Sequence, residues 1–211
     1  MALVRVARLR HLAVMAVSTK PSRRRVPRKV SRAYLERAAL AHLGRHASTV
    51  ANLRRLLMRR IGRSIEAHGT DPDEAAAWLE AVLVKLVRLG YLDDRAYAMS
   101  KARYLLRHGK PRAAIGAALA AKGVPAEVIE QTLGALAGEG TNLDLIAAAA
   151  FARRRRFGPY RTGDGDARDG GREKTLAAFA RAGFSYAVTR RVLDAPDRDT
   201  LEAELAMGSS S

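Results

Sequence analysis

Clustered arginines and lysines are the side chains in this sequence best suited to binding chemistry. Guanidinium and ammonium groups bind phosphate through charge-assisted hydrogen bonds. Each such residue alone is more often a solvated surface residue, but the set predicts a basic face that matches a phosphate backbone or an acidic groove. Aromatic residues make up only 5% of the chain, so base stacking is not expected to dominate. The candidate binding residues are Arg54, Arg55, Arg59, Arg60, Lys101, Arg103, Arg107, Lys110, Arg112, Lys122, Arg153, Arg154, Arg155 and Arg156.

The net charge of +17 is distributed in alternating blocks. Residues 1–31 carry +9 and residues 32–63 carry +7, but residues 64–94 carry −5. Residues 95–123 then carry +7, and residues 124–152 carry −4. A GC-rich genome explains the excess of arginine over lysine but not this alternation. A chain this basic is expected to bind a polyanion, of which nucleic acid is the commonest.

The sequence contains no recognisable catalytic or metal-binding pattern. It has no cysteine, which excludes disulfides and thiolate metal sites. His42 and His46 are four residues apart, but Gly44 lies between them at the expected end of a helix, which argues against a zinc site. Asp93 and Asp94 are interpreted as a chain corner and a helix cap. There is no Walker loop for ATP. We therefore expect no enzymatic activity, no metal and no cofactor.

Alanine and leucine dominate the apolar residues, and both favour helix, so the sequence predicts an all-α fold. The clearest helix start is at Asp71, where Pro72 suits the first helical position and Glu74 completes a capping box. An apolar stripe follows and ends at Gly90; it consists of Trp78, Leu79, Val82, Leu83, Leu86 and Val87. Further helices are predicted at about 31–43, 48–62, 94–107, 110–122, 125–136, 142–156, 172–182 and 185–193.

Glycines end the second helix of each predicted trio, at Gly62, Gly123 and Gly183, which are 61 and 60 residues apart. This period predicts tandem three-helix units, with chance agreement between alanine-rich helices as the alternative. We expect an elongated, curved protein. Its predicted parts are a basic, disordered extension at residues 1–30, units at 31–92, 93–138 and 139–195, a loop insertion at 158–171 and a tail at 196–211.

The first residues favour a cytoplasmic protein. The apolar residues of segment 1–17 are interrupted by arginines, so they do not form the core of a signal peptide. An organellar transit peptide or a true start at Met15 are the alternatives. No apolar stretch is long enough to span a membrane, so no membrane partner is expected.

Three segments resemble the RecX family of recombinase regulators. Leu86 to Ala98 reads LVRLGYLDDRAYA, Ile115 to Val124 reads IGAALAAKGV, and Ala182 to Ser185 reads AGFS. Their order and distances are similar to those of the family over about residues 31–194. Asn52 and Ala118 depart from the acidic residue that the family often has before the central leucine of its second helices.

The resemblance implies a monomeric protein that binds RecA filaments together with single- and double-stranded DNA. It implies that the protein negatively modulates RecA ATPase, strand exchange, DNA repair and the SOS response. From the residues alone, two alternatives remain: a sequence-specific helix-turn-helix DNA-binding regulator, and a ribosome- or RNA-associated helical protein.

Overall fold

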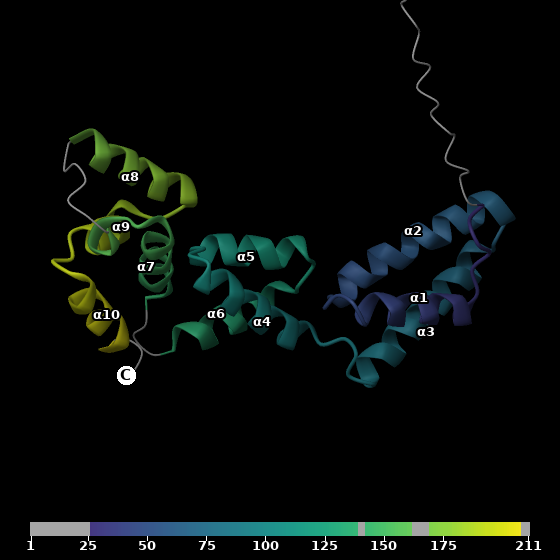
Figure 1. Cartoon of the computed structure of the whole chain (residues 1–211). Helices are drawn as coiled ribbons and strands as arrows, with labels where there is room; N and C mark the ends of the chain where they lie inside the picture. Colours follow the sequence, from purple (N-terminus) through teal and green to yellow (C-terminus); the bar gives the residue numbers. More distant parts are fainter. Residues whose placement is uncertain (1–25, 139–141, 162–168, 208–211) are drawn as a thin grey trace, which may run out of the picture.

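The computed structural model describes residues 26–138, 142–161 and 169–207. These residues form helices and no strand, in an elongated arrangement (Figure 1), so the predicted all-α fold class is confirmed. The elements are α1 (Arg32–Leu43), α2 (Val50–His68), α3 (Pro72–Arg88), α4 (Asp94–Arg107), α5 (Arg112–Ala121), α6 (Ala126–Ala137), α7 (Leu143–Arg155), the 3-10 helix η1 (Gly158–Tyr160), α8 (Asp169–Ala182), α9 (Tyr186–Leu193) and α10 (Arg198–Met207).

Separate hydrophobic clusters divide these helices into an N-terminal bundle (α1–α3), a middle bundle (α4–α6) and a C-terminal bundle (α7–α10). Each bundle roughly matches one predicted unit, but the equivalence of the three as repeats stays a prediction. The fully buried side chains include Leu35, Leu57 and Leu83 in the N-terminal bundle, Ile115 and Leu119 in the middle bundle, and Phe179 and Val192 in the C-terminal bundle.

Helix α3 begins as predicted, and Leu79, Val82, Leu83 and Leu86 of the predicted stripe are buried, but the two ends of the stripe differ from the prediction. The Asp71 side chain accepts a hydrogen bond from the N–H of Glu74 at 2.9 Å, and a proline occupies the first helical position. Val87 is 47% exposed and Trp78 only half-buried, whereas Ala75 is fully buried. A stripe drawn in steps of four residues drifts around a helix of 3.6 residues per turn, which explains the difference at Trp78 and Val87.

Gly62 does not end the second helix, so this part of the predicted repeat is wrong. Helix α2 continues to His68 and ends at Gly69, whose φ of +60° places it in the left-handed region. A glycine inside a helix costs only about 1 kcal/mol relative to alanine. Burial of Ile61 and Ser64 on either side continues the packed face and offsets that cost. Gly123 does follow the end of its helix, as predicted.

The predicted extension at residues 1–30 is wrong for its last residues, which belong to the fold. Val30 is buried in the N-terminal bundle, and its N–H donates to the Ser64 hydroxyl at 2.9 Å. Residues 1–25 of the predicted extension lie outside the described residues.

The predicted tail and loop insertion are also partly helical. Helix α10 lies within the predicted tail and buries Leu201 completely. Helix α8 begins at Asp169, inside the predicted loop. The 3-10 helix η1 lies at the start of that loop, and its Tyr160 is buried. Residues 162–168 lie outside the described residues.

Candidate nucleic-acid and filament interface

Basic and acidic residues concentrate on different helices of the N-terminal and middle bundles. Helices α2, α5 and α8 follow one another along one side of the molecule, the upper side in Figure 1. Several predicted binding residues lie on α2 and at the ends of α5. Acidic residues concentrate instead on α3, with Asp73, Glu74 and Glu80, and on α6, with Glu127 and Glu130. The alternation of charge along the sequence therefore reflects the order of helices within a bundle.

Two of the predicted binding residues are paired within their own bundle. Arg54 on α2 forms a two-pronged ion pair with Glu80 on α3. Arg112 on α5 pairs with Glu130 on α6 at 2.8 Å. Both pairs are exposed, where such bridges contribute about 0–1 kcal/mol. These two arginines link neighbouring helices in the free protein and are partly neutralised there.

Two further predicted residues contact the neighbouring bundle. The Arg55 guanidinium donates to the carbonyl of Ala121 at 3.2 Å, and the Arg154 guanidinium donates to the carbonyl of His108 at 2.7 Å. Both carbonyls lie at or next to the end of a helix, where the macrodipole favours a cation. These arginines therefore join bundles as well as contributing charge.

Three more of the predicted residues contact an aromatic side chain. Lys101 lies over the Tyr104 ring, 5.0 Å from its centroid, and Arg155 lies 5.8 Å from the Phe151 centroid. Arg60 donates to the Tyr34 hydroxyl at 3.0 Å.

The remaining predicted residues are exposed, and their side chains have no hydrogen-bond or ion-pair partner among the described residues. Several gather where α4 and α7 approach each other, because the end of α4 packs against α7. This cluster is the strongest candidate for an external polyanion. The unpartnered residues are Arg59, Arg103, Arg107, Lys110, Lys122, Arg153 and Arg156.

Two aspartates in the first turn of a helix tie each bundle to the preceding one. The Asp94 carboxylate of α4 accepts from the N–H of Val50 at the start of α2, at 2.9 Å. The Asp144 carboxylate of α7 accepts from the N–H of Arg112 at the start of α5, at 2.6 Å. Asp93, not Asp94, caps α4 itself. Sequence reasoning assigned the aspartate pair to a local corner and missed this contact between bundles.

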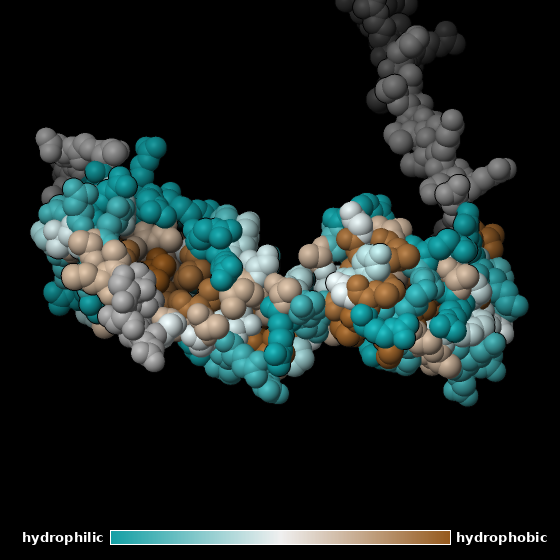
Figure 2. Space-filling model, turned by 90° about the horizontal axis from the view of Figure 1, so that it is seen from below, coloured by the Kyte–Doolittle hydropathy of each residue, from teal (hydrophilic) through white to brown (hydrophobic). Residues whose placement is uncertain are grey.

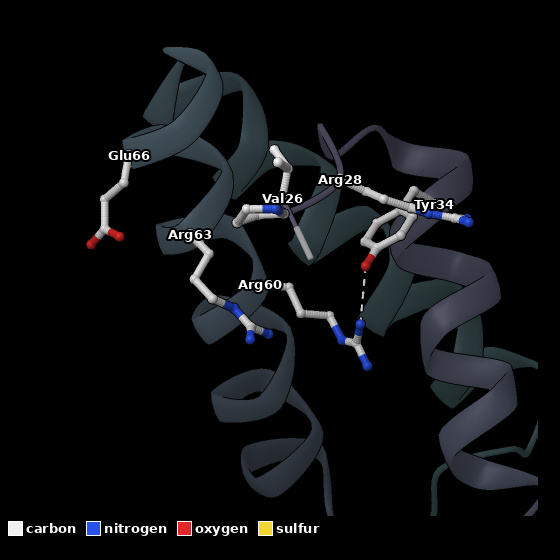
Figure 3. A pocket seen from close by; sticks show the side chains of 7 residues that line it. Val26, Arg28, Tyr34, Arg60, Arg63 and Glu66 are labelled. Atoms are coloured by element: carbon white, nitrogen blue, oxygen red, sulfur yellow. Dashed lines mark hydrogen bonds between the residues drawn. The ribbon is translucent and has the colours of Figure 1, made fainter. Parts of the chain in front are cut away.

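A basic groove in the N-terminal bundle was also missed. It lies between residues 26–28, α1 and α2 (Figure 3). Its lining includes Arg60, which was predicted, and four arginines that were not: Arg28, Arg37, Arg45 and Arg63. The signal available in the sequence was spacing, because residues three apart, such as Tyr34 and Arg37 or Arg60 and Arg63, share a helix face.

Burial and neighbouring cations perturb His42 at the same groove. Desolvation, followed by repulsion from His46, Arg45 and Arg60, lowers the pKa of His42. The rings of His42 and His46 are 5.3 Å apart. No cluster of three or more histidine, aspartate or glutamate side chains that could hold a metal occurs in the described ranges.

Apolar side chains are exposed at the end of α3. They include Val84, Val87, Leu89 and Tyr91. Figure 2 shows hydrophobic surface on the N-terminal bundle and also on the body formed by the other two bundles. Exposed apolar patches commonly mark protein contacts.

Among the described helices, none is long and apolar enough to cross a membrane.

Comparison with known proteins identifies consistent relatives. A family model described as the second three-helix domain of RecX matches residues 93–133. The chain is 47% identical to Regulatory protein RecX of Myxococcus xanthus over 168 residues, which cover 80% of this chain and 88% of the relative. It is 35% identical to Regulatory protein RecX of Agrobacterium fabrum over 156 residues, or 74% of this chain and 79% of the relative.

A solved structure shares the fold. The crystal structure of RecX from Lactobacillus salivarius aligns with a TM-score of 0.51 at 21% identity, over 83% of this chain and 97% of that chain. At this level of identity the likeness concerns the arrangement of helices alone.

Proposed function

The chain belongs to the RecX family of regulatory proteins, and on this premise we propose that it binds RecA filaments and the DNA within them and restrains RecA activity. Family membership, at 47% identity over 80% of the chain, is the observation that carries the proposal. We place the protein in the cytoplasm as a monomer that acts by binding, without catalysis of its own, and lowers RecA ATPase, strand exchange and the SOS response.

Unpartnered cations support attachment to DNA. Arg103, Arg107 and Lys110 lie on or next to α4, close to the cations that end α7. An extended phosphate backbone presents regularly spaced charges, and each neutralised phosphate releases condensed counterions. Because the chain has few aromatic residues, this binding is expected to be largely independent of base sequence.

Exposed apolar side chains support contact with a protein. Val84, Leu89 and Tyr91 lie at one end of the N-terminal bundle and are not covered by the described chain. A protein filament can bury such a patch, whereas DNA phosphates gain nothing from it. The proposal therefore assigns the α3 end to the RecA subunits and the cations near α4 and α7 to DNA.

Titration of the protein into RecA ATPase on single-stranded DNA tests this function. Substoichiometric protein should suppress the DNA-dependent ATPase. Unchanged ATPase at equimolar protein, with RecA from a related bacterium, would contradict the proposal. Val84→Asp should weaken the suppression while leaving DNA binding unchanged, because it alters only the proposed protein contact.

Salt titrations of matched variants test the DNA contact separately. Arg103→Ala/Arg107→Ala removes two unpartnered cations, and Arg54→Ala/Arg112→Ala removes two that are paired with glutamates. The first variant should flatten the log–log dependence of affinity on salt by about 1.4 units, from a slope of about 0.7 per phosphate on single strands. The second should flatten it less. Equal effects of the two variants would show only a general charge effect. Loss on one oligonucleotide sequence alone would instead favour the helix-turn-helix alternative.

A further inference from the structure

A groove with a volume of about 880 Å³ lies between the segment before α1 and the facing surfaces of α1 and α2. It adjoins a smaller hollow of about 370 Å³, and the two share the side chains of Arg28, Tyr34 and Arg60. In Figure 3, Arg60 and Arg63 extend from α2, and Arg28 lies beside Tyr34. Three separate segments therefore contribute side chains to one concave surface.

The positive charge of the groove is not neutralised by neighbouring carboxylates. None of the five arginines that line it pairs with a carboxylate in the part of the chain that the structure describes. Glu66 is the one acidic residue named in the lining, and its carboxylate points away from Arg60 and Tyr34 in Figure 3. Glu36 on α1 pairs with Lys85 of α3 instead. The five arginines are Arg28, Arg37, Arg45, Arg60 and Arg63.

Four arginines near the C-terminus behave differently. Arg172, Arg190, Arg191 and Arg198 of the C-terminal bundle each form an ion pair with an aspartate or a glutamate. A folded protein gains little from leaving like charges together, because their repulsion is destabilising. The concentration of unpaired arginines at the groove therefore calls for an anion from outside the chain.

The groove is held in shape by contacts within the protein. The N–H of Val30 bonds to Ser64, and the ring of His68 contacts the carbonyl of Pro27 at 2.5 Å. These two contacts fix the segment that carries Arg28 against α2. Preorganised donors of this kind lose less conformational entropy when they bind a ligand.

Several side chains of the groove are held in place by hydrogen bonds and still have N–H or O–H groups free to bind a ligand. The Nε atoms of Arg45 and Arg63 donate to the backbone carbonyls of Ala41 and Arg59, at 3.0 and 3.2 Å, so the terminal nitrogens of each guanidinium remain available. Tyr34 accepts from Arg60, which leaves its own O–H free to donate.

The buried Nε2 atom of His42 gives an independent sign of a missing ligand. It has no hydrogen-bond partner among the described residues, although buried polar atoms are nearly always satisfied. His42 lines the smaller hollow together with Arg45 and Arg60. An anion in this hollow would relieve the repulsion between these cations.

We infer that this groove is a phosphate-binding site, formed by Arg28, Tyr34, Arg37, His42, Arg45, Arg60 and Arg63. Planar guanidinium groups recognise phosphate oxygens in pairs, and several converging guanidiniums suit a group with more than one negative charge. The inference deepens the proposed function, because the DNA backbone is one source of phosphate. A free polyphosphate or nucleotide presents the same chemistry and is the second source.

Calorimetric titration of the full chain with inorganic pyrophosphate tests the site. The wild-type protein should show saturable binding, and Arg60→Gln/Arg63→Gln should weaken it by about tenfold or more, because two charged donors are lost. The matched control is Arg54→Gln/Arg59→Gln, which removes the same charge from the same helix outside the groove. Arg28→Gln/Arg37→Gln provides a second groove variant if the first does not fold, as judged by circular dichroism.

Two further readouts identify the ligand. Pyrophosphate should shift the ring resonances of His42 in NMR spectra, which a diffuse ion atmosphere would not do selectively. Displacement of pyrophosphate by a single-stranded oligonucleotide assigns the site to DNA, and its retention assigns the site to a free phosphate compound. Absence of saturable binding, or equal losses in groove and control variants, would overturn the inference. RecA is absent from these measurements, so failure of the proposed function leaves their result unchanged.

Discussion

The junction between the N-terminal and middle bundles and the junction between the middle and C-terminal bundles share one device. In each, an aspartate at the start of one bundle accepts a hydrogen bond from the start of the second helix of the preceding bundle, Asp94 from Val50 and Asp144 from Arg112. In each, the glycine after a second helix also meets the start of the preceding second helix. Gly123 approaches α2 in this way, and Gly183 approaches the start of α5.

The two junctions differ in the contacts that surround this hydrogen bond and glycine. The end of helix α4 packs against α7, and Leu106 contacts the hydrophobic clusters of both the middle and the C-terminal bundles. At the first junction the recorded contacts are largely polar, such as the bond from the Thr49 hydroxyl to the carbonyl of Lys122 at 2.6 Å. No residue belongs to the hydrophobic clusters of both the N-terminal and middle bundles among the described residues.

This difference teaches how far the bundles depend on one another. Apolar packing over a helix face couples the unfolding of two bundles, because opening one exposes the other. A few hydrogen bonds fix an orientation with much smaller coupling. We therefore expect the middle and C-terminal bundles to behave as one body, to which the N-terminal bundle is hinged.

Phe179→Ala should have the largest effect on this comparison. Phe179 is fully buried and packs its ring against those of Phe151 and Phe184. Its truncation should lower the free energy of unfolding by about 3–5 kcal/mol. Hydrogen exchange should accelerate in the C-terminal and middle bundles and stay unchanged in α1–α3. Equal acceleration in all three bundles would contradict the expected independence of the N-terminal bundle.

Alanine substitutions at Gly109 and Gly123 compare the junctions directly. Both residues have positive φ, +70° and +78°. A Cβ at Gly109 would lie 2.7 Å from backbone atoms of Phe151, whereas one at Gly123 would meet the Cβ of Ala51 at 2.5 Å. We expect Gly109→Ala to cost about 3 kcal/mol, from left-handed strain and overpacking, because backbone cannot move aside.

Gly123→Ala should cost less, because the first junction can open without disrupting either core. Chemical denaturation measures both costs, and small-angle scattering should show a change of shape for Gly123→Ala. A larger loss of stability for Gly123→Ala than for Gly109→Ala would reverse the comparison.

Removal of the two aspartates should give a smaller effect, about 1 kcal/mol each. Asp94→Ala should also change the orientation of the N-terminal bundle, because few other contacts hold it. Asp144→Ala should leave the orientation of its bundles unchanged, because α4 and α7 stay packed. Distances between spin labels on α2 and α5, and on α5 and α9, measure these orientations. Asp94→Asn and Asp144→Asn keep an acceptor oxygen and serve as controls; the same change of orientation in both alanine variants would contradict the expected difference.

Acidification should give the smallest effect, confined to the N-terminal bundle. Burial and nearby cations lower the pKa of His42 from its ordinary 6.5, so the unfolded chain binds more protons between the two values. The contribution of His42 to stability is therefore complete above about pH 6.5 and declines as pH falls below it.

The C-terminal bundle should resist this change. Hydrogen bonds from Arg172 and Arg190 lower the pKa of Asp194 from 3.8, so its contribution is retained until pH falls below about 4. Hydrogen exchange at pH 7.5 and 5.5 should accelerate more in α1–α3 than in α7–α9. His42→Gln should reduce the pH dependence of α1–α3, and an unchanged dependence would show that other groups dominate.

Local signals in the sequence were sufficient for most of the fold. The capping box at Asp71 and the abundance of alanine and leucine predicted helices, because these preferences act within one or two turns. Gly123 and Gly183 were correctly placed after helices because a glycine with positive φ stops a helix locally. Gly62 failed as a stop because packing of Ile61 and Ser64 with the rest of the bundle overrides a weak local preference.

The sequence by itself determined which residues are basic, that they alternate in blocks with acidic ones, and that they lie on helices. Only the tertiary structure decided which cations remain available. Arg54 meets Glu80 from 26 residues away, and Arg28 joins Arg60 across a groove, although nothing local distinguishes these arginines. The physical reason is that helix formation depends on neighbours within one or two turns, whereas pairing of charges depends on which helix faces meet after the cores have packed.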